Sequence, residues 1–186
     1  MRNVILVHGI NGTPKIFEWL KSELEKSDYE VIMPSFSIQE GTIYKRWKEI
    51  LNQYKGSINS DSIVVCHSIG NEFIIKYLTE YHISIDTYIG LAGFAEAFYN
   101  EGKDALNAAV ERFTVSEGEK REFRALTSNR YAIYSDNDHI VPFEVLERYP
   151  REIDAKSIFI PGIGHMGKKS GLEKLPELLE LVKENL

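Results

Sequence analysis

The stretch Ser62-Ile63-Val64-Val65-Cys66-His67-Ser68-Ile69-Gly70 decides the fold of this chain. An apolar, β-branched run comes first, and an amphipathic run that continues to Tyr81 follows it directly. This order predicts a strand that turns sharply into a helix, with the Ser68 hydroxyl exposed at the turn. A serine placed there is typical of nucleophilic acyl chemistry, which also needs a histidine and an acid. The alternative is a chance strand-turn-helix junction, because a Ser-x-Gly triplet is expected about once in a chain of this length.

Six short apolar runs, rich in Val, Ile, Leu and Tyr, have the length and composition of buried strands. They are residues 4–7, 30–33, 62–66, 87–91, 131–135 and 156–160. The runs are nearly continuous in apolar residues rather than alternating, which indicates that both faces of the sheet are covered. We therefore expect a mostly parallel, six-stranded sheet with helices on each side.

Helical patterns separate most of the predicted strands. They follow Thr13-Pro14, cover residues 43–54 and 69–81, and begin again at Pro176. At the first of them, Thr13 is expected to cap a helix whose first residue is Pro14. Strands that alternate with helices through right-handed crossovers predict a three-layer, doubly wound α/β fold.

The segment 93–130 is longer than a crossover needs. It is expected to hold two helices, at residues 103–113 and 117–126. Two interpretations stay open: a small lid over the site, or an extended crossover packed on the sheet edge. The aromatic start of this segment is expected to line an acyl pocket through Phe94, Phe98 and Tyr99.

The composition of the 186 residues is ordinary for a globular protein, with 43% hydrophobic and 27% charged residues. A net charge of -6 and the lack of a basic run argue against nucleic acid as the main partner. The single cysteine cannot form an internal disulfide, which suits a reducing compartment. The apolar run before His8 is too short for a signal peptide or a membrane span. We expect one cytoplasmic domain, residues 1–186, that acts on a small molecule.

Chemistry-bearing residues follow four of the predicted strands. In doubly wound sheets, ligands bind outside the carboxyl ends of the strands. The loops at that edge are residues 8–12, the turn at Ser68, residues 136–139 and residues 161–165. Candidates for a nucleophile, an acid and a base therefore share one edge, in the chain order Ser, Asp, His.

Five histidines compete for the role of general base, and the imidazole titrates in the range that this role requires. His165 is preferred, because it stands in a glycine-rich loop that can reach across the edge of the sheet. His67 is expected to diverge from the nucleophile, and His8 to hold the first loop through its ring nitrogens. His82 is expected to lie at the opposite end of the sheet, and His139 to stay beside an adjacent acid.

The acid must orient the imidazole and stabilise its charged form. Asp138 is preferred over Asp136, because the turn gives it reach before Val141-Pro142 restarts regular structure. A solvated acidic loop or an Asx turn is the plain alternative for either residue. The triplet 136–138 lacks the glycine and the distal glutamate of a calcium loop, so no metal is expected.

An oxyanion needs two backbone N–H donors in such a site. One is expected from Ile69, directly after the nucleophile, and the other from Ile10 in the first loop. Gly9 and Gly12 let that loop approach closely, and the dipole of the following helix favours the negative charge.

Four motifs together resemble an α/β-hydrolase: His8-Gly9-Ile10, His67-Ser68-Ile69-Gly70, Asp138-x-x-Val141-Pro142 and Gly164-His165. In size and layout the chain is similar to the small, nearly capless members of that superfamily, including the minimal bacterial lipases. It most resembles the retinoblastoma-binding (YdeN-like) serine hydrolase family, over nearly the whole chain. The resemblance implies a serine hydrolase without a cofactor, whose triad is Ser68, Asp138 and His165.

Two departures from the family pattern stand out. Cys66 replaces the first glycine of the usual nucleophile motif, and cysteine is small enough for a tight turn. No Leu-x-Cys-x-Glu motif is present, so binding of pocket proteins is not implied.

The sequence as a whole predicts hydrolysis of a small acyl ester through an acyl-enzyme. A thioesterase or amidase using the same triad is one alternative, since the triad serves all acyl transfers. A binding protein that keeps the fold and has little turnover is the other.

Overall fold

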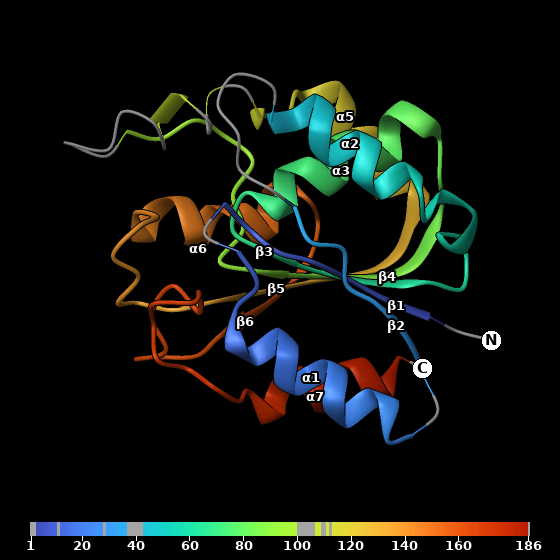
Figure 1. Cartoon of the computed structure of the whole chain (residues 1–186). Coiled ribbons are helices and arrows are strands. Elements are labelled where there is room, and N and C mark those ends of the chain that lie inside the picture. The colour runs from blue at the N-terminus through green and yellow to red at the C-terminus, as the bar shows by residue number, and fades with distance from the viewer. Residues whose placement is uncertain are drawn as a thin grey trace.

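A parallel sheet of six strands runs through the middle of the molecule (Figure 1). This computed structural model describes residues 3–10, 12–27, 29–36, 43–99, 107–108, 111 and 113–185. The strands are β1 (Asn3–Val7), β2 (Glu30–Ile32), β3 (Ile63–His67), β4 (Ile85–Leu91), β5 (Thr127–Tyr134) and β6 (Lys156–Phe159). They lie in the order β2-β1-β3-β4-β5-β6, and every pairing is parallel. The predicted six-stranded parallel sheet is confirmed.

Helices cover both faces of the sheet, so the three-layer prediction is confirmed (Figure 1). One face carries α1 (Lys15–Glu25) and α7 (Pro176–Glu184). The other face carries α2 (Ile43–Asn52), α3 (Gly70–Tyr81), α5 (Glu117–Leu126) and α6 (Phe143–Glu152), and a short 3-10 helix (Lys55–Ser57) precedes β3. This is the α/β-hydrolase fold.

Helix α1 begins one residue later than the sequence predicted. Pro14 is the N-cap, in an extended conformation (φ -70°, ψ 150°), and Lys15 is the first helical residue. Thr13 therefore does not cap the helix. Four residues form an apolar stripe on this helix and are fully buried: Ile16, Phe17, Leu20 and Leu24.

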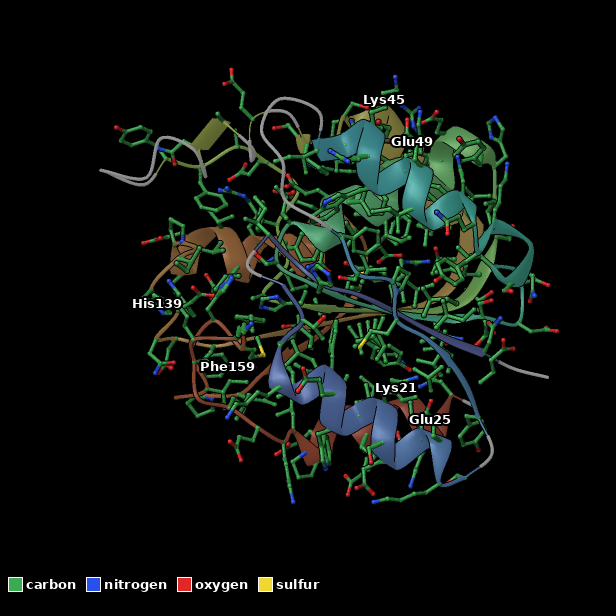
Figure 2. The ribbon with its side chains drawn as sticks, in the orientation of Figure 1. Lys21, Glu25, Lys45, Glu49, His139 and Phe159 are labelled. Carbon is green, nitrogen blue, oxygen red and sulfur yellow. The ribbon has the colours of Figure 1, made fainter. Side chains whose placement is uncertain are left out.

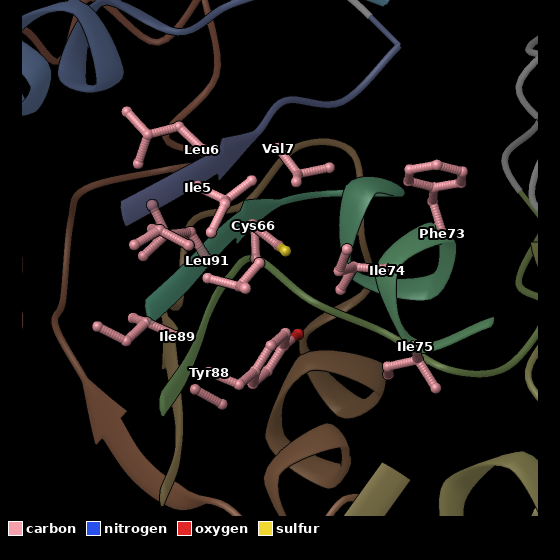
Figure 3. Packing of buried hydrophobic residues seen from close by; sticks show 14 of the residues in the cluster. Ile5, Leu6, Val7, Cys66, Phe73, Ile74, Ile75, Tyr88, Ile89 and Leu91 are labelled. Atoms are coloured by element: carbon pink, nitrogen blue, oxygen red, sulfur yellow. The ribbon is translucent and has the colours of Figure 1, made fainter. Parts of the chain in front are cut away.

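The core lies between the sheet and α3 on one side and between the sheet and α1 on the other. Strands β1 and β3 are buried at every position, as the continuous apolar runs indicated. Figure 3 shows Cys66 in β3 with its sulfur on the side of α3, near Ile74. Its thiol is fully buried, and burial raises the pKa of that thiol. Cys66 is therefore a core residue beneath the turn at Ser68.

Strand register brings the ends of the central strands to one edge. Val7 pairs with Cys66 across β1 and β3, and His67 pairs with Leu91 across β3 and β4. Leu91 in turn pairs with Ile133 of β5. The loops that follow these strands consequently start side by side, which is what the rule for ligand sites in such sheets requires.

The segment 93–130 contains helix α5, as predicted. Its start carries a capping box, in which the Ser116 hydroxyl accepts from the Glu119 N–H while the Glu119 carboxylate accepts from the Ser116 N–H. Most of the predicted helix at residues 103–113 lies outside the described residues. Lys76 of α3 forms an ion pair with Glu119 at 2.9 Å, so α5 is packed on α3.

Within the described ranges no helix is long and apolar enough to cross a membrane.

Candidate active site

Ser68 stands on a strained turn between β3 and α3. Its φ is 55°, in the left-handed region that non-glycine residues rarely adopt. The Ser68 N–H donates to the Leu91 carbonyl at 2.9 Å, and the Ser68 carbonyl accepts from the Asn71 N–H at 2.9 Å. Gly70 is needed at this turn, because a Cβ there would lie 2.8 Å from the Val7 carbonyl oxygen. The turn thus presents the hydroxyl at the edge of the sheet, as predicted.

A buried polar network beneath the turn holds this conformation. The Asn71 side-chain amide donates to the Ser68 carbonyl at 2.6 Å and to the Leu91 carbonyl at 3.2 Å. Its Oδ1 accepts from the Tyr88 hydroxyl, which also lies 2.5 Å from the Tyr149 hydroxyl of α6. Because these groups are buried and bonded to one another, they fix the turn against β4 and α6. This role of Asn71 was not predicted from the sequence.

Three side chains from distant loops meet at Ser68. Its hydroxyl oxygen lies 3.1 Å from His165 Nε2, and His165 Nδ1 lies 2.7 Å from Asp138 Oδ2. The carboxylate can only accept, so Nδ1 carries the proton and Nε2 is left to accept from the Ser68 hydroxyl. The structure therefore brings together the three residues that the sequence analysis selected, in the order hydroxyl, imidazole, carboxylate.

Asp138 is held ionised behind His165. Burial by itself raises its pKa, but the hydrogen bond from His165 and those from the Val141 and Ile140 N–H groups outweigh that effect, and the net pKa is lowered. The two backbone donors bind Oδ1 at 3.0 and 2.7 Å. One carboxylate oxygen thus serves the loop and the other serves the imidazole.

Asp136, the alternative acid, has a different task. Its Oδ1 accepts from the Gly162 N–H at 2.9 Å, and that bond is the main cause of its lowered pKa. Asn137 Oδ1 accepts from the Gly164 N–H at 2.7 Å. These bonds tie the loop after β5 to the loop after β6, and so they place Asp138 beside His165.

His67, directly before the nucleophile, packs against the base. The two rings meet edge to face, with their centroids 4.8 Å apart. His67 Nε2–H donates to the His165 carbonyl at 2.7 Å, which leaves Nδ1 as an acceptor with no partner among the described residues. Burial, and secondly the neighbouring His165, lowers the pKa of His67 to about 3. His67 is therefore neutral, and its hydrogen bond to the His165 carbonyl fixes the backbone of the base.

The loop after β1 lies against the nucleophile. A Cβ at Gly9 would lie 3.0 Å from Ser68 Cβ and 3.2 Å from the His67 carbonyl oxygen. The Gly12 N–H donates to the Gly9 carbonyl at 3.2 Å and closes a turn that contains Ile10. In the described part of the chain, neither the Ile10 nor the Ile69 N–H has a hydrogen-bond partner. Both predicted donors are thus available beside Ser68.

His8 supports this loop, as the sequence predicted. Its Nδ1–H donates to the Gly9 carbonyl at 2.7 Å, and its Nε2 accepts from the Phe36 N–H at 2.9 Å. Of the other histidines, His82 lies at the far end of α3, where it contacts Glu122 at 2.5 Å. The His139 ring lies 6.2 Å from that of His165, on the rim of the site.

A cavity of about 360 Å³ opens at Ser68. Its walls come from the loop after β1, the turn at Ser68, the acid loop and the loop after β6. The lining residues are Gly9, Ile10, Gly12, His67, Ser68, Ile69, His139, Ile140, His165, Gly167, Lys168, Lys169 and Ser170. Three lining residues were not predicted, although each is within four residues of the acid or the base: Ile140, Lys168 and Lys169.

The structure does not bring the three predicted pocket aromatics to this cavity. Phe94 is buried in the core, with its ring 4.7 Å from that of Phe98. Tyr99 is 71% exposed, and it lines a separate hollow together with Phe98. The physical reason is that Phe94, three residues after the end of β4, is buried in the core, where burial of an aromatic ring is strongly favourable.

Comparison with known proteins places the chain among hydrolases. The model of the serine hydrolase family matches residues 4–184. YdeN of Bacillus subtilis (strain 168), which is named as a hydrolase, is 22% identical over 187 residues, 97% of this chain and 94% of that protein. The crystal structure of the ydeN gene product matches with a TM-score of 0.87 at 21% identity, over 100% of this chain and 98% of that one. A structure from work on carboxylesterases of the thaumarchaeon Nitrososphaera gargenis matches with a TM-score of 0.70 at 15% identity, over 98% and 89% of the chains.

Proposed function

Because this chain belongs to the serine hydrolase family, we propose that it cleaves small acyl esters with Ser68 as nucleophile, His165 as general base and Asp138 as the group that orients His165. The observation that carries the proposal is the pair of hydrogen bonds from the Ser68 hydroxyl through His165 to Asp138, 3.1 and 2.7 Å long. Ser68 and His165 line a cavity whose volume is that of a small-molecule site.

The reaction proceeds in two halves. Ser68 Oγ attacks the acyl carbonyl while His165 Nε2 takes the hydroxyl proton. The tetrahedral intermediate collapses, and the leaving alcohol receives that proton from the imidazolium. Water then attacks the acyl-enzyme with His165 Nε2 as base, which releases the carboxylic acid and restores Ser68. Asp138 stabilises the imidazolium in both halves, and its lowered pKa keeps it ionised for this task.

The oxyanion of each intermediate is stabilised by the N–H groups of Ile10 and Ile69. Their lack of partners among the described residues supports this assignment. Helix α3 begins at Gly70, so its N-terminal dipole adds to the stabilisation. Loss of one such donor costs about 3 kcal/mol of transition-state stabilisation.

The size of the cavity supports a compact acyl group. Its volume of about 360 Å³ is near the lower end of the range of roughly 300–1,000 Å³ found for small-molecule sites. Thioesters and activated amides present the same carbonyl to the same groups, so the leaving group must be compared directly.

A fluorophosphonate probe tests the nucleophile. We expect Ser68→Ala to abolish labelling and the hydrolysis of 4-nitrophenyl acetate and butyrate, and His165→Ala to reduce both strongly. Ser60→Ala is the matched control, because Ser60 is exposed before β3, at the opposite end of that strand. Full labelling of Ser68→Ala, or equal ester turnover by the native protein and His165→Ala, overturns the proposal and favours a binding protein. Parallel assays with butyryl thioester and butyryl anilide separate an esterase from a thioesterase or amidase.

A further inference from the structure

We propose that the cavity at Ser68 selects substrates that carry a negative charge away from the scissile carbonyl, and that Lys168 and Lys169 recognise this charge. The inference rests on the proposed function, because it assigns a substrate class to the same site. Both lysines line the cavity, and both are exposed at its mouth.

A tight turn presents the two lysines. The Ser170 N–H and the Ser170 hydroxyl both donate to the Gly167 carbonyl, at 3.0 and 2.7 Å. Lys168 and Lys169 are the two central residues of this turn, so they stand at its tip. The Ser170 hydroxyl oxygen also accepts from the Leu172 N–H at 3.3 Å, which anchors the turn to the chain that follows.

The turn begins directly against the rings of His165, the proposed base, and of His67. A Cβ at Gly167 would lie 3.2 Å from His67 Cε1 and 3.3 Å from His165 Cδ2. Consecutive Cα atoms are about 3.8 Å apart, so the Lys168 side chain starts one peptide unit beyond Gly167, which lies against the base. A lysine stem spans about 6 Å, which lets the ammonium group meet a substrate several ångströms beyond the reacting carbonyl.

The charge at this mouth differs from that of the molecule as a whole. The chain carries a net charge of -6. Among the described residues that line the cavity there is no Asp or Glu. Of the eleven other lysines of the described chain, six form ion pairs: Lys15, Lys21, Lys26, Lys48, Lys76 and Lys120. Within that same part of the chain no carboxylate lies within ion-pair distance of Lys168 or Lys169.

Two adjacent cations with no carboxylate partner in the described chain, at the entrance to a cavity, raise the local concentration of anionic ligands and stabilise them when bound. Because both ammonium groups are exposed, the interaction is modest and is screened by salt. The anion, a carboxylate or a phosphate, belongs either to the far end of the acyl chain or to the leaving group.

Matched esters test the acyl side. The 4-nitrophenyl monoester of adipic acid and 4-nitrophenyl hexanoate have the same chain length and differ in a terminal carboxylate. We expect native kcat/KM to favour the anionic ester. Lys168→Met with Lys169→Met should lower kcat/KM for it about tenfold and for the neutral ester less than twofold, since exposed charges a few ångströms apart interact weakly. Added sodium chloride should shrink the preference in the native protein only.

The control pair is Lys45→Met with Lys183→Met. It removes the same net charge from exposed positions of α2 and α7. Figure 2 shows Lys45 on α2 at the top of the view, away from His139 at the left, which lines the cavity. We expect this pair to leave the ratio of the two kcat/KM values unchanged.

The leaving-group side is tested with butyryl-coenzyme A against butyryl-N-acetylcysteamine, which share the thioester and differ in the phosphates. A preference confined to the adipate ester assigns the anion to the acyl chain, and one confined to the coenzyme A thioester assigns it to the leaving group. A ratio of kcat/KM that is the same in the native protein and the Lys168/Lys169 variant for both pairs overturns the inference.

Binding separates this inference from the proposed function. In the Ser68→Ala protein, isothermal titration calorimetry should show that the adipate monoester, or the coenzyme A thioester, binds more tightly than its neutral match. That difference should vanish when Lys168→Met and Lys169→Met are added. Equal binding overturns the inference even if native protein hydrolyses esters. Absence of ester hydrolysis by native protein overturns the proposed function and leaves the calorimetry to decide the charge preference.

Discussion

The loops after β5 and β6 are joined to each other by side-chain hydrogen bonds, whereas the segment after β4 combines aromatic packing with backbone hydrogen bonds, such as that from the Val115 N–H to the Ala95 carbonyl at 3.1 Å. Asp136 and Asn137 accept from backbone N–H groups of the β6 loop, and Ser135 accepts from the Ile163 N–H at 3.1 Å. After β4, Phe94 packs into the core and onto Phe98. Catalytic geometry must hold to a fraction of an ångström, and bonds with fixed direction supply it better than ring packing does. The polar loops therefore carry the site, and the aromatic segment supports the core.

The largest expected effect on activity comes from replacing each of the two acids, in turn, by asparagine. Asp138→Asn removes the charge that stabilises the imidazolium and favours the wrong tautomer of His165, so kcat for 4-nitrophenyl butyrate should fall by about 10³- to 10⁴-fold. Asp136→Asn keeps an acceptor for the Gly162 N–H and should lower kcat by less than about tenfold. A larger loss in Asp136→Asn than in Asp138→Asn contradicts the assignment of the acid.

The pH dependence of stability tests the buried histidine of the polar region. The pKa of His67 is about 3 in the folded protein, against an ordinary value of 6.5. Between these values the unfolded chain binds more protons than the folded one, so this stabilisation is complete above 6.5 and is lost as the pH falls toward 3. The loss due to His67 should reach on the order of 3 kcal/mol by about pH 4.

Urea unfolding at several pH values measures this contribution. His67→Gln keeps a side-chain donor for the His165 carbonyl and lacks the titration, so its free energy of unfolding should fall less steeply below pH 6.5 than that of the native protein. His82→Gln is the control, because His82 is exposed on the far end of α3. Parallel curves for the native protein and His67→Gln contradict a neutral, buried His67.

Much of the fold could be predicted because its signals are local. Continuous apolar runs marked all six strands, and the amphipathic periods of α1 and α3 marked their helices. The edge at which Ser68, Asp138 and His165 meet could be predicted because the carboxyl ends of parallel strands lie at the same edge of the sheet. The cap at Thr13 was wrong, because an extended Pro14 moved the start of the helix by one residue.

The walls of the cavity could not be predicted in the same way. Which side chains face it depends on where each loop crosses the edge, and sequence distance does not determine that. Phe94, Phe98 and Tyr99 looked like pocket residues because they are aromatic and follow a strand. No motif in the sequence singles out Lys168 and Lys169, which the bonds of Ser170 to Gly167 place at the mouth of the cavity.

Gly9→Ala should disturb the site more than the fold. A Cβ at Gly9 meets Ser68 Cβ at 3.0 Å and the His67 carbonyl oxygen at 3.2 Å, so the loop that carries the Ile10 N–H must move by a few tenths of an ångström. We expect kcat to fall roughly 10- to 100-fold with little change in the melting temperature, since displaced donors stabilise the oxyanion poorly. Gly118→Ala on α5 is the control, because the nearest atom to a Cβ there lies 3.8 Å away. An unchanged kcat in Gly9→Ala contradicts a role for this loop at the oxyanion.

The smallest expected effect is on KM, and it comes from substitutions that compare the acid loop with the segment after β4. Ile140 lines the cavity, whereas Phe98 lines a separate hollow. Ile140→Ala removes an apolar wall, and about 1 kcal/mol of lost contact raises KM for 4-nitrophenyl hexanoate roughly fivefold. Phe98→Ala should change KM less than twofold and should act on the melting temperature instead, because its ring packs on Phe94. A KM that responds to Phe98 and not to Ile140 means that the acyl chain follows the aromatic segment after β4, and that this segment, rather than the acid loop, forms the substrate wall.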